Sequence, residues 1–225
     1  MVDKFIVYII YLLPFSLVFS RFLSDFTISL CALIFFFLLI KKKFVSFYKN
    51  KLILIFFIWC FYIIINSIYS ENVLLSLQSS LFYFRFGLFV LVFYYLSNKF
   101  DNFLKFFCLS FFIIILFLLT DSFLQYITGN NIFGYAYNGV KLSSFFKDEE
   151  ILGSFLSRTY LLPVLGYLIN NKRLKYENEL LLTYIFLVFF VIFISGERTA
   201  FFIFFLNIII LIFSYRTIFK KNIKY

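Results

Sequence analysis

The sequence predicts an all-α protein built as a polytopic bundle of transmembrane helices, and three observations support this fold class. First, 64% of the 225 residues are hydrophobic and only 14% are charged, whereas soluble domains are near one half apolar and one quarter charged. Second, the apolar residues form long runs. Third, lysine and arginine gather in one set of the connections between these runs. The mean hydropathy of +0.99 excludes a soluble globular enzyme, a disordered segment and a nucleic-acid-binding module.

Eight apolar runs approach the length of about 20 residues that a helix needs to cross the hydrocarbon core. Backbone amides in lipid must be satisfied within the protein, which favours helices. The run 111–119 lacks the alternation that a membrane barrel requires. We therefore expect a single transmembrane domain over residues 1–225. Its predicted spans are 5–20, 24–40, 52–70, 75–97, 103–121, 151–169, 178–194 and 199–215, and its one long connection is the outer loop 122–150.

The basic residues predict the orientation, because cytoplasmic connections carry an excess of lysine and arginine. With a cytoplasmic N-terminus, eight alternating crossings place residues 41–43 and Lys172, Arg173 and Lys175 on the cytoplasmic side. Both termini are then expected in the cytoplasm. The net charge of +10 mostly reflects this topology, so it does not call for a nucleic-acid partner.

The outer loop 122–150 has its own turn chemistry. It is rich in residues that favour tight turns, namely Gly129, Gly134, Gly139, Asn130, Asn131 and Asn138. Loops of this kind often carry binding residues. A plain connector between two spans is an equally good interpretation.

Two arginines fall inside predicted spans, where an ionisable side chain is a functional hypothesis by default. At 1.5 Å per residue, Arg85 lies about 15 Å and Arg158 about 10 Å from the outer end of its span. Arg198 marks the outer end of the last span. Guanidinium groups bind oxyanions bidentately and stay charged when desolvated, and long side chains can snorkel. We predict that the three arginines converge on a diphosphate in a cavity that opens outward.

The start of the last span adds a second anion-binding device. The segment Ser195-Gly196-Glu197-Arg198-Thr199 combines a glycine break with a serine or threonine cap. The free amides and the positive dipole end of the helix then face outward, where they favour an anion. Glu197 and Thr199 are therefore predicted to support the site.

Other polar residues near the predicted site have weaker signals. Asp121 ends the fifth span and is predicted as a base or as a partner of Arg85, and Gln125 as a contact for a sugar or headgroup. Purely structural interpretations stay open: Arg85 forms an ion pair with Asp121 or Glu71, and Arg198 is an interface anchor.

The surroundings of the sixth span have structural interpretations. The acids Asp148, Glu149 and Glu150 precede this span, where carboxylates complement a helix dipole. Pro163 predicts a kink further along it.

Some chemistry is missing from the chain. There is no histidine, which excludes imidazole as a base, nucleophile or metal ligand. Cys31, Cys60 and Cys108 lie in separate apolar runs and are interpreted as buried small hydrophobes. We expect neither a metal nor another cofactor.

Several motifs resemble those of the O-antigen ligase and O-antigen polymerase family of membrane proteins. The family's extracytoplasmic loop resembles Leu124-Gln125-Tyr126, the segment Gly129-Asn130-Asn131-Ile132-Phe133-Gly134-Tyr135, and Leu142-Ser143-Ser144-Phe145-Phe146-Lys147-Asp148-Glu149 continuing through Gly153 to Arg158. Ser195-Gly196-Glu197-Arg198-Thr199-Ala200 is similar to the family's Ser-Gly-x-Arg-Thr-Ala segment, and Arg85 is similar to an arginine in an early span.

The resemblance implies part of a GT-C-like membrane glycosyltransferase. Such proteins transfer a glycan from an undecaprenyl-diphosphate carrier to lipid A–core or to another repeat unit during lipopolysaccharide assembly, without a cofactor. They work at the periplasmic face of the bacterial inner membrane. Their arginines would hold the diphosphate, and a histidine in a later loop is implicated in catalysis. Because this chain has no histidine, the resemblance implies either a truncated or split product or a degenerate relative, which holds the diphosphate and lacks the base.

Two other functions stay open. The same arginines would serve a transporter for an anionic or lipid-linked solute. Alternatively, the chain is an inactive fragment whose helices merely pack.

Overall fold

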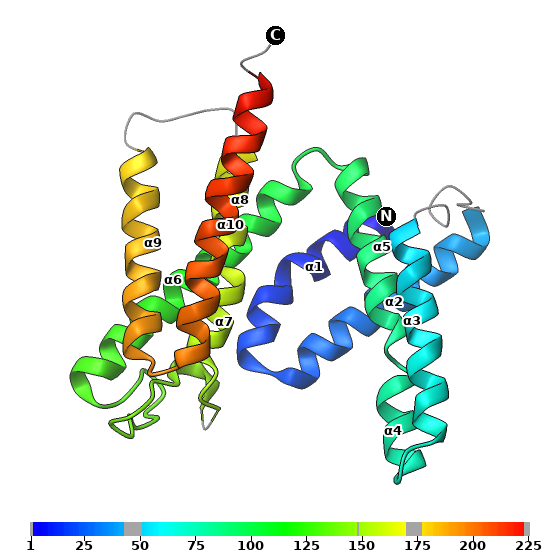
Figure 1. Cartoon of the computed structure of the whole chain (residues 1–225), viewed down its shortest axis with the longest axis horizontal. Coiled ribbons are helices and arrows are strands. Elements are labelled where there is room, and N and C mark those ends of the chain that lie inside the picture. The colour runs from blue at the N-terminus through cyan, green and yellow to red at the C-terminus, as the bar shows by residue number, and fades with distance from the viewer. Residues whose placement is uncertain (1, 43–50, 148, 170–176, 223–225) are drawn as a thin grey trace. The chain divides into compact units, whose positions relative to one another are not determined.

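A computed structural model describes residues 2–42, 51–147, 149–169 and 177–222. The chain divides into two compact units, Met1–Phe103 and Leu104–Tyr225, and each unit is described by itself (Figure 1). Several residues on which the predicted orientation depends, among them Lys43, Lys172, Arg173 and Lys175, lie outside the described residues, as does Asp148.

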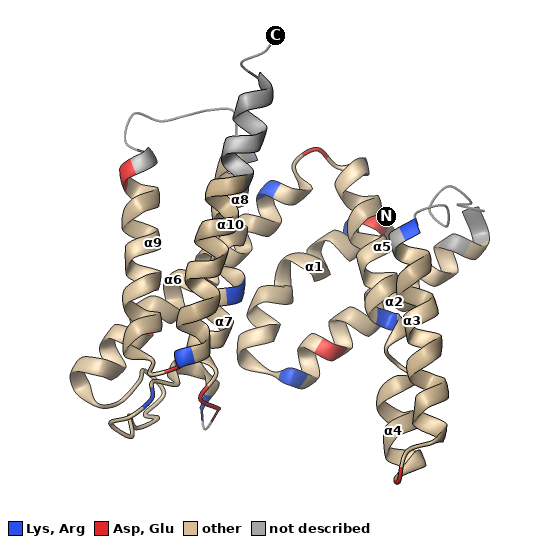
Figure 2. Ribbon diagram, in the orientation of Figure 1, with Lys and Arg blue, Asp and Glu red and all other residues tan. Residues whose placement is uncertain are grey.

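The predicted all-α class is confirmed for the described residues, which form helices and one isolated antiparallel bridge between Asn130 and Ala136. In Figure 2, long stretches of helix carry no charge. The described chain has four helical stretches long and apolar enough to cross a membrane: Val2–Phe19, Arg21–Leu38, Val73–Lys99, which a turn divides, and Phe103–Thr128. Three shorter apolar helices are Ile53–Ile68, Glu179–Ile194 and Arg198–Phe213. The count of eight crossings stays a prediction.

The N-terminal unit is organised around one central helix. Its helices are α1 (Val2–Phe19), α2 (Arg21–Lys42), α3 (Lys51–Ile68), α4 (Val73–Ser80) and α5 (Phe84–Lys99). Helix α2 packs against both α1 and α5, and α3 packs against α4. The core between α2 and α5 is apolar and includes Phe35, Leu91 and Leu96, which are all fully buried.

The predicted span 75–97 consists of two helices rather than one. A turn at residues 81–83 separates α4 from α5. Two serines of α4 bond to α3 and to the turn after it: the Ser67 hydroxyl of α3 donates to Ser80 Oγ over 2.9 Å, and the Ser70 hydroxyl of the turn donates to Ser76 Oγ over 2.8 Å. Arg85 therefore lies in the first turn of a helix, not in the middle of one.

The C-terminal unit has a folded loop at one end of its helices. Its elements are α6 (Phe103–Thr128), the 3-10 turn η2 (Ser144–Phe146), α7 (Leu152–Thr159), α8 (Leu161–Ile169), α9 (Glu177–Ile194) and α10 (Arg198–Asn222). Helix α7 packs against α9 and α10. Figure 1 shows the loop at the end of the unit where α6 and α9 end and where α7 and α10 begin.

One predicted boundary in this unit changes. Helix α6 continues through the start of the predicted outer loop 122–150 and ends at Thr128, before Gly129 with a φ of +80°. A glycine in this left-handed conformation is the usual residue just after a helix end.

The predicted kink from Pro163 is confirmed as a break at Tyr160 between α7 and α8. Proline has no N–H to bond to the carbonyl of the fourth residue before it, Thr159.

Candidate functional site

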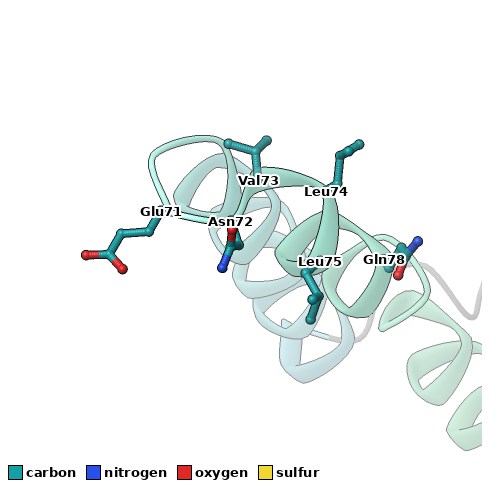
Figure 3. Close-up of a pocket in the computed structure, with 6 residues that line it drawn as sticks. All are labelled: Glu71, Asn72, Val73, Leu74, Leu75 and Gln78. Atoms are coloured by element: carbon teal, nitrogen blue, oxygen red, sulfur yellow. The ribbon is translucent and has the colours of Figure 1, made fainter.

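One surface hollow lies at the α3–α4 turn and contains none of the predicted site residues. It has a volume of about 480 Å³ and is lined by Glu71, Asn72, Val73, Leu74, Leu75 and Gln78. Figure 3 shows these six side chains pointing in different directions rather than toward a common centre. A single carboxylate and two amides without convergence do not form a binding site, so the polar clusters of the two units are better candidates.

Arg85 forms an ion pair within the N-terminal unit. Its Nη2 lies 2.9 Å from Asp25 Oδ1, and its Nη1 donates to Ser29 Oγ over 3.1 Å. Asp25 and Ser29 lie one turn apart on α2, so α2 presents both to the fork of the guanidinium. The guanidinium also lies 5.0 Å from the centre of the Phe86 ring. The partner of Arg85 is therefore Asp25, in place of Asp121 or Glu71.

Asp121 is completely buried at the loop end of α6 and holds the loop in place. Its Oδ1 accepts from the Ile132 amide over 2.9 Å, and its Oδ2 accepts from the Ser144 hydroxyl over 2.5 Å. Both donors belong to the polar loop, defined here as residues 129–150. These bonds give Asp121 a structural role in the polar loop.

Gln125 lies one turn after Asp121 on the same face of α6 and completes the anchoring. Its Oε1 accepts from the Ser144 amide over 2.8 Å, and its Nε2 donates to the Tyr135 carbonyl over 3.2 Å. The Gln125 side chain is fully buried. A direct contact of Gln125 with a sugar or headgroup would therefore require the polar loop to open.

Asn131 organises the polar loop from within. Its Nδ2 donates to the Ser144 carbonyl over 2.8 Å, while its Oδ1 accepts from the amides of Phe133 and Tyr135. Ser144 has a φ of +49°, which is costly for a residue with a side chain. Its amide, carbonyl and hydroxyl are each bonded to a different buried side chain, and these bonds hold the conformation.

Glu197 reaches from the start of α10 to the start of α7. Its Oε1 accepts from the Gly153 amide over 2.7 Å and its Oε2 from the Ser154 amide over 2.9 Å, and the Ser154 hydroxyl donates to the same carboxylate. A carboxylate on the first amides of a helix satisfies donors that have no intrahelical partner. The anion at the start of α7 is thus supplied by the protein itself.

Glycines at positions 153 and 196 allow the backbone to approach its neighbours closely around Glu197. A Cβ on Gly153 would lie 2.5 Å from Ser195 Oγ and 3.1 Å from Glu197 Oε1. Gly196 has a φ of +73°, and a Cβ there would lie 2.7 Å from the Val140 carbonyl oxygen. The Ser195 hydroxyl donates back to the Ile192 carbonyl over 2.7 Å. Ser195 therefore closes the end of α9 instead of capping α10.

An ion pair closes the polar loop beside Glu197. Lys141 Nζ lies 2.8 Å from Glu150 Oε2, and Asn138 Nδ2 donates to Glu150 Oε1 over 3.0 Å. The hydrogen bond to Glu150 raises the pKa of Lys141 above its ordinary value, and the same bond lowers the pKa of Glu150. Both groups thus stay charged around neutral pH.

Arg158 and Arg198 are exposed and have no ion-pair partner among the described residues. Arg158 lies in the last turn of α7, one residue after Ser157, whose carbonyl accepts from Asn207 Nδ2 of α10 over 2.9 Å. Arg198 opens α10 next to the bonded Glu197. Thr199 is also exposed. The exposed cations of this unit therefore remain accessible for an external anion.

The structure joins some predicted site residues and leaves others apart. Asp121 and Gln125 share the Ser144 anchor. Glu197 joins the starts of α7 and α10. Arg85 belongs to the N-terminal unit and Arg158 and Arg198 to the other, so the convergence of the three arginines stays a prediction.

Sequence reasoning gave no role to Asp25, Ser29 and Lys141, and it named Asn131, Ser144 and Glu150 without the contacts that organise these clusters. The spacing of Asp25 and Ser29 one turn apart was a usable signal, because a polar pair on one face of an apolar helix needs a partner. Ser144 gave no signal, because its left-handed φ is not expected of serine.

Comparison with known proteins gives no match: no family model, curated protein or solved structure is significantly similar to this chain.

Proposed function

We propose that the chain takes part in transferring a glycan from an undecaprenyl-diphosphate carrier to an acceptor sugar, either lipid A–core or another repeat unit. The proposed setting is the periplasmic face of a bacterial inner membrane. Eight crossings with both termini in the cytoplasm, in a bundle like part of a GT-C glycosyltransferase, belong to the same proposal. Its basis is the resemblance to the O-antigen ligase and polymerase family.

One structural observation carries the proposal. The motifs that show the resemblance are dispersed over residues 124–158 and 195–200, yet hydrogen bonds join them into one region of the C-terminal unit. Gln125 bonds to Tyr135 and Ser144, and Glu197 bonds to Gly153 and Ser154. Segments that are merely connectors between spans do not need buried side chains to hold them together. This organisation favours a binding role for the polar loop over a plain connector.

The exposed arginines have the chemistry that a diphosphate requires. A guanidinium binds a phosphate bidentately and remains charged. We assign the diphosphate primarily to Arg158 and Arg198, because neither charge is neutralised by another described residue. The charge of Arg85 is already matched by Asp25, so a contribution from Arg85 would be indirect.

The proposed reaction is a substitution at the anomeric carbon of the donor sugar. The acceptor hydroxyl oxygen forms the new bond to this carbon, while the bond from the carbon to the diphosphate oxygen breaks. The diphosphate leaves with the bonding electrons, and the arginines stabilise the charge that develops on it. A base takes the proton of the acceptor hydroxyl. Because the chain has no histidine, this base is another residue type or comes from another polypeptide.

A transporter for an anionic or lipid-linked solute is the second candidate. Two observations favour it: the breaks between α4 and α5 at residues 81–83 and between α7 and α8 at Tyr160. Interrupted helices are a feature of transporter binding sites.

Deleting the gene in its host separates the two candidates. A transferase predicts loss of the finished surface glycan and accumulation of lipid-linked precursor on the periplasmic side. A transporter predicts accumulation of precursor on the cytoplasmic side. For a transferase, the wild-type gene should restore the glycan, whereas a gene with both Arg158→Ala and Arg198→Ala should not. Unchanged glycan and unchanged precursor in the deletion strain would contradict both candidates and favour an inactive fragment.

A further inference from the structure

A second concave feature of the C-terminal unit lies along α6, α8 and α9, and it is distinct from the polar loop. This groove has a volume of about 680 Å³, within the range of about 300–1,000 Å³ typical of small-molecule sites. Its floor includes Cys108, Val164 and Tyr184, which are buried, and its walls include Leu109 and Leu180, which are 46% and 66% exposed. Gly166 closes the floor, because a Cβ there would lie 2.4 Å from Cys108 Cβ. The groove is therefore a preformed apolar channel.

Lys105 is the one charged residue among the described residues that line the groove. Two hydroxyls in the lining are already committed, since Thr183 donates to the Glu179 carbonyl over 2.8 Å and Tyr184 donates to the Tyr160 carbonyl over 3.2 Å. The Lys105 side chain is exposed, and no described carboxylate pairs with it. The groove thus presents hydrocarbon along its length and one cation at its end.

The length of the groove matches one leaflet of a membrane. Along α6 the lining runs from Lys105 to Leu116, which at 1.5 Å per residue corresponds to roughly 16 Å. Half of a hydrocarbon core of about 30 Å is about 15 Å. Lys105 is the third residue of α6, so its ammonium group would lie at the headgroup level when the acyl region covers the rest. A ligand with one anionic head and one chain as long as a leaflet fits both features.

We propose that this groove binds an anionic phospholipid, with one acyl chain along α6, α8 and α9 and with the phosphate beside Lys105. A lysine at the membrane surface attracts anionic lipids and can place its stem along apolar surface while its charge reaches the headgroups. A zwitterionic lipid would fill the channel equally well but would gain less from Lys105. A polyprenyl phosphate would share the charge but is longer than the groove. The proposal does not depend on glycan transfer, because the groove lies at the opposite end of α6 from the polar loop.

Lipid retention tests the proposal. The full chain is placed in nanodiscs that contain equal amounts of phosphatidylcholine and phosphatidylglycerol, released into mild detergent, and analysed by native mass spectrometry. Wild-type protein should retain phosphatidylglycerol about fivefold over phosphatidylcholine, as expected for one lysine near a membrane surface. Lys105→Ala should remove this preference, and Lys105→Arg should keep it. Equal retention of the two lipids by the wild type, or an unchanged preference in Lys105→Ala, would overturn the proposal.

A matched pair of tryptophan variants tests the location of the lipid. Leu109→Trp fills the groove, whereas Leu124→Trp adds the same bulk to the same helix outside it, at a residue of nearly equal exposure, 45%. The first variant should lose the retained lipid and the second should keep it. The double variant Arg158→Ala/Arg198→Ala should also keep it, which separates this lipid from any ligand of the polar loop. Retention of phosphatidylglycerol by Leu109→Trp would contradict an anionic phospholipid in this groove. So would displacement of the wild type's bound lipid by added undecaprenyl phosphate but not by added phosphatidylglycerol.

Discussion

Arg85 in the N-terminal unit and Arg158 and Arg198 in the C-terminal unit have contrasting surroundings. In the N-terminal unit, Arg85 is matched by Asp25 and Ser29 from a neighbouring helix. In the C-terminal unit, Arg158 and Arg198 are exposed, and none of the described carboxylates pairs with them. A charge that the protein neutralises itself stabilises its own packing. A charge that the protein leaves unmatched is a better candidate for an external ligand.

The two units also differ in how they use their carboxylates. Asp25 serves an arginine, whereas Asp121 and Glu197 accept from backbone amides and serine hydroxyls. In the C-terminal unit, Asp121 therefore fixes the polar loop and Glu197 fixes the start of α7, while Glu150 pairs with Lys141. This comparison favours Arg158 and Arg198, which lie in the same unit as the polar loop, over Arg85 for the proposed diphosphate site.

Removing Asp121 should have the largest effect on the C-terminal unit. Asp121→Ala leaves the Ile132 amide and the Ser144 hydroxyl without their buried acceptor, and each unsatisfied donor costs about 1–3 kcal/mol. We expect the free energy of opening of the polar loop to fall by about 3 kcal/mol, measured as faster hydrogen exchange of the Ile132 amide. Thr120→Ala is the control, because the exposed Thr120 hydroxyl donates to the Phe117 carbonyl of its own helix and bonds to no other described residue. Equal exchange in the two variants would show that Asp121 does not anchor the loop.

Breaking the contact between α7 and α10 should have the next largest effect. Glu197→Ala removes the acceptor of the Gly153 and Ser154 amides, and loss of such a helix cap costs about 1–2 kcal/mol. Gly153→Ala should destabilise the unit as well, because the new methyl group would overlap Ser195 Oγ. Thermal unfolding in detergent measures both variants. Thr199→Ala, at an exposed neighbouring residue, should leave the unfolding temperature nearly unchanged, and a similar loss in all three variants would argue against a specific cap.

The ion pair of the N-terminal unit should contribute less. The side chains of Arg85 and Asp25 are 25% and 56% exposed, so solvent screens their attraction and a coupling free energy of about 0.5–1 kcal/mol is expected. A double-mutant cycle with Arg85→Ala and Asp25→Ala measures this coupling in the free energy of unfolding. A coupling free energy of zero would mean that Asp25 does not neutralise Arg85 energetically. The contrast between Arg85 and the arginines of the C-terminal unit would then be wrong.

Acidification should have the smallest effect, confined to the polar loop. The lowered pKa of Glu150 means that its contribution is present above its ordinary pKa of 4.5 and is lost as the pH falls through the folded value. The raised pKa of Lys141 means that its contribution is present below its ordinary pKa of 10.5 and is lost as the pH rises through the folded value. A spin label at the exposed Val140 should gain mobility as the pH falls below 4.5, the ordinary pKa of Glu150, and stay constant near neutral pH. Lys141→Met should abolish this pH dependence, and a pH response that survives Lys141→Met would have another origin.

The helical class could be predicted from composition and apolar runs, because the structure has helices in all eight predicted spans. The break at Tyr160 was predictable too, because Pro163 cannot donate to the preceding turn. The break at residues 81–83 was not predictable, because Leu81, Phe82 and Tyr83 are not helix-breaking residues. The fifth predicted span ends at Asp121, whereas α6 continues to Thr128. Gly129 indicates the observed end, because a glycine with positive φ often follows a helix.

The site was only partly predictable, because its polar contacts join residues that are distant in sequence. Glu197 and Gly153 are 44 residues apart and Arg85 and Asp25 are 60 apart. Residue type and membrane depth identify which side chains need partners, but they do not identify the partners. The supporting roles of Asp121 and Gln125 in a ligand site stay predictions, and the structure adds that both side chains bond to Ser144.

The affinity of single arginine variants for undecaprenyl diphosphate in nanodiscs tests the central claim most directly, with undecaprenyl monophosphate as the reference ligand. Loss of one charge-assisted hydrogen bond costs about 1.5–3 kcal/mol, or roughly tenfold or more in the dissociation constant. Arg158→Gln and Arg198→Gln should each weaken diphosphate binding by about this factor, and Arg85→Lys should change it by less than about twofold. A large loss in Arg85→Lys, with unchanged binding in the other two variants, would contradict the assignment of the diphosphate to the C-terminal unit.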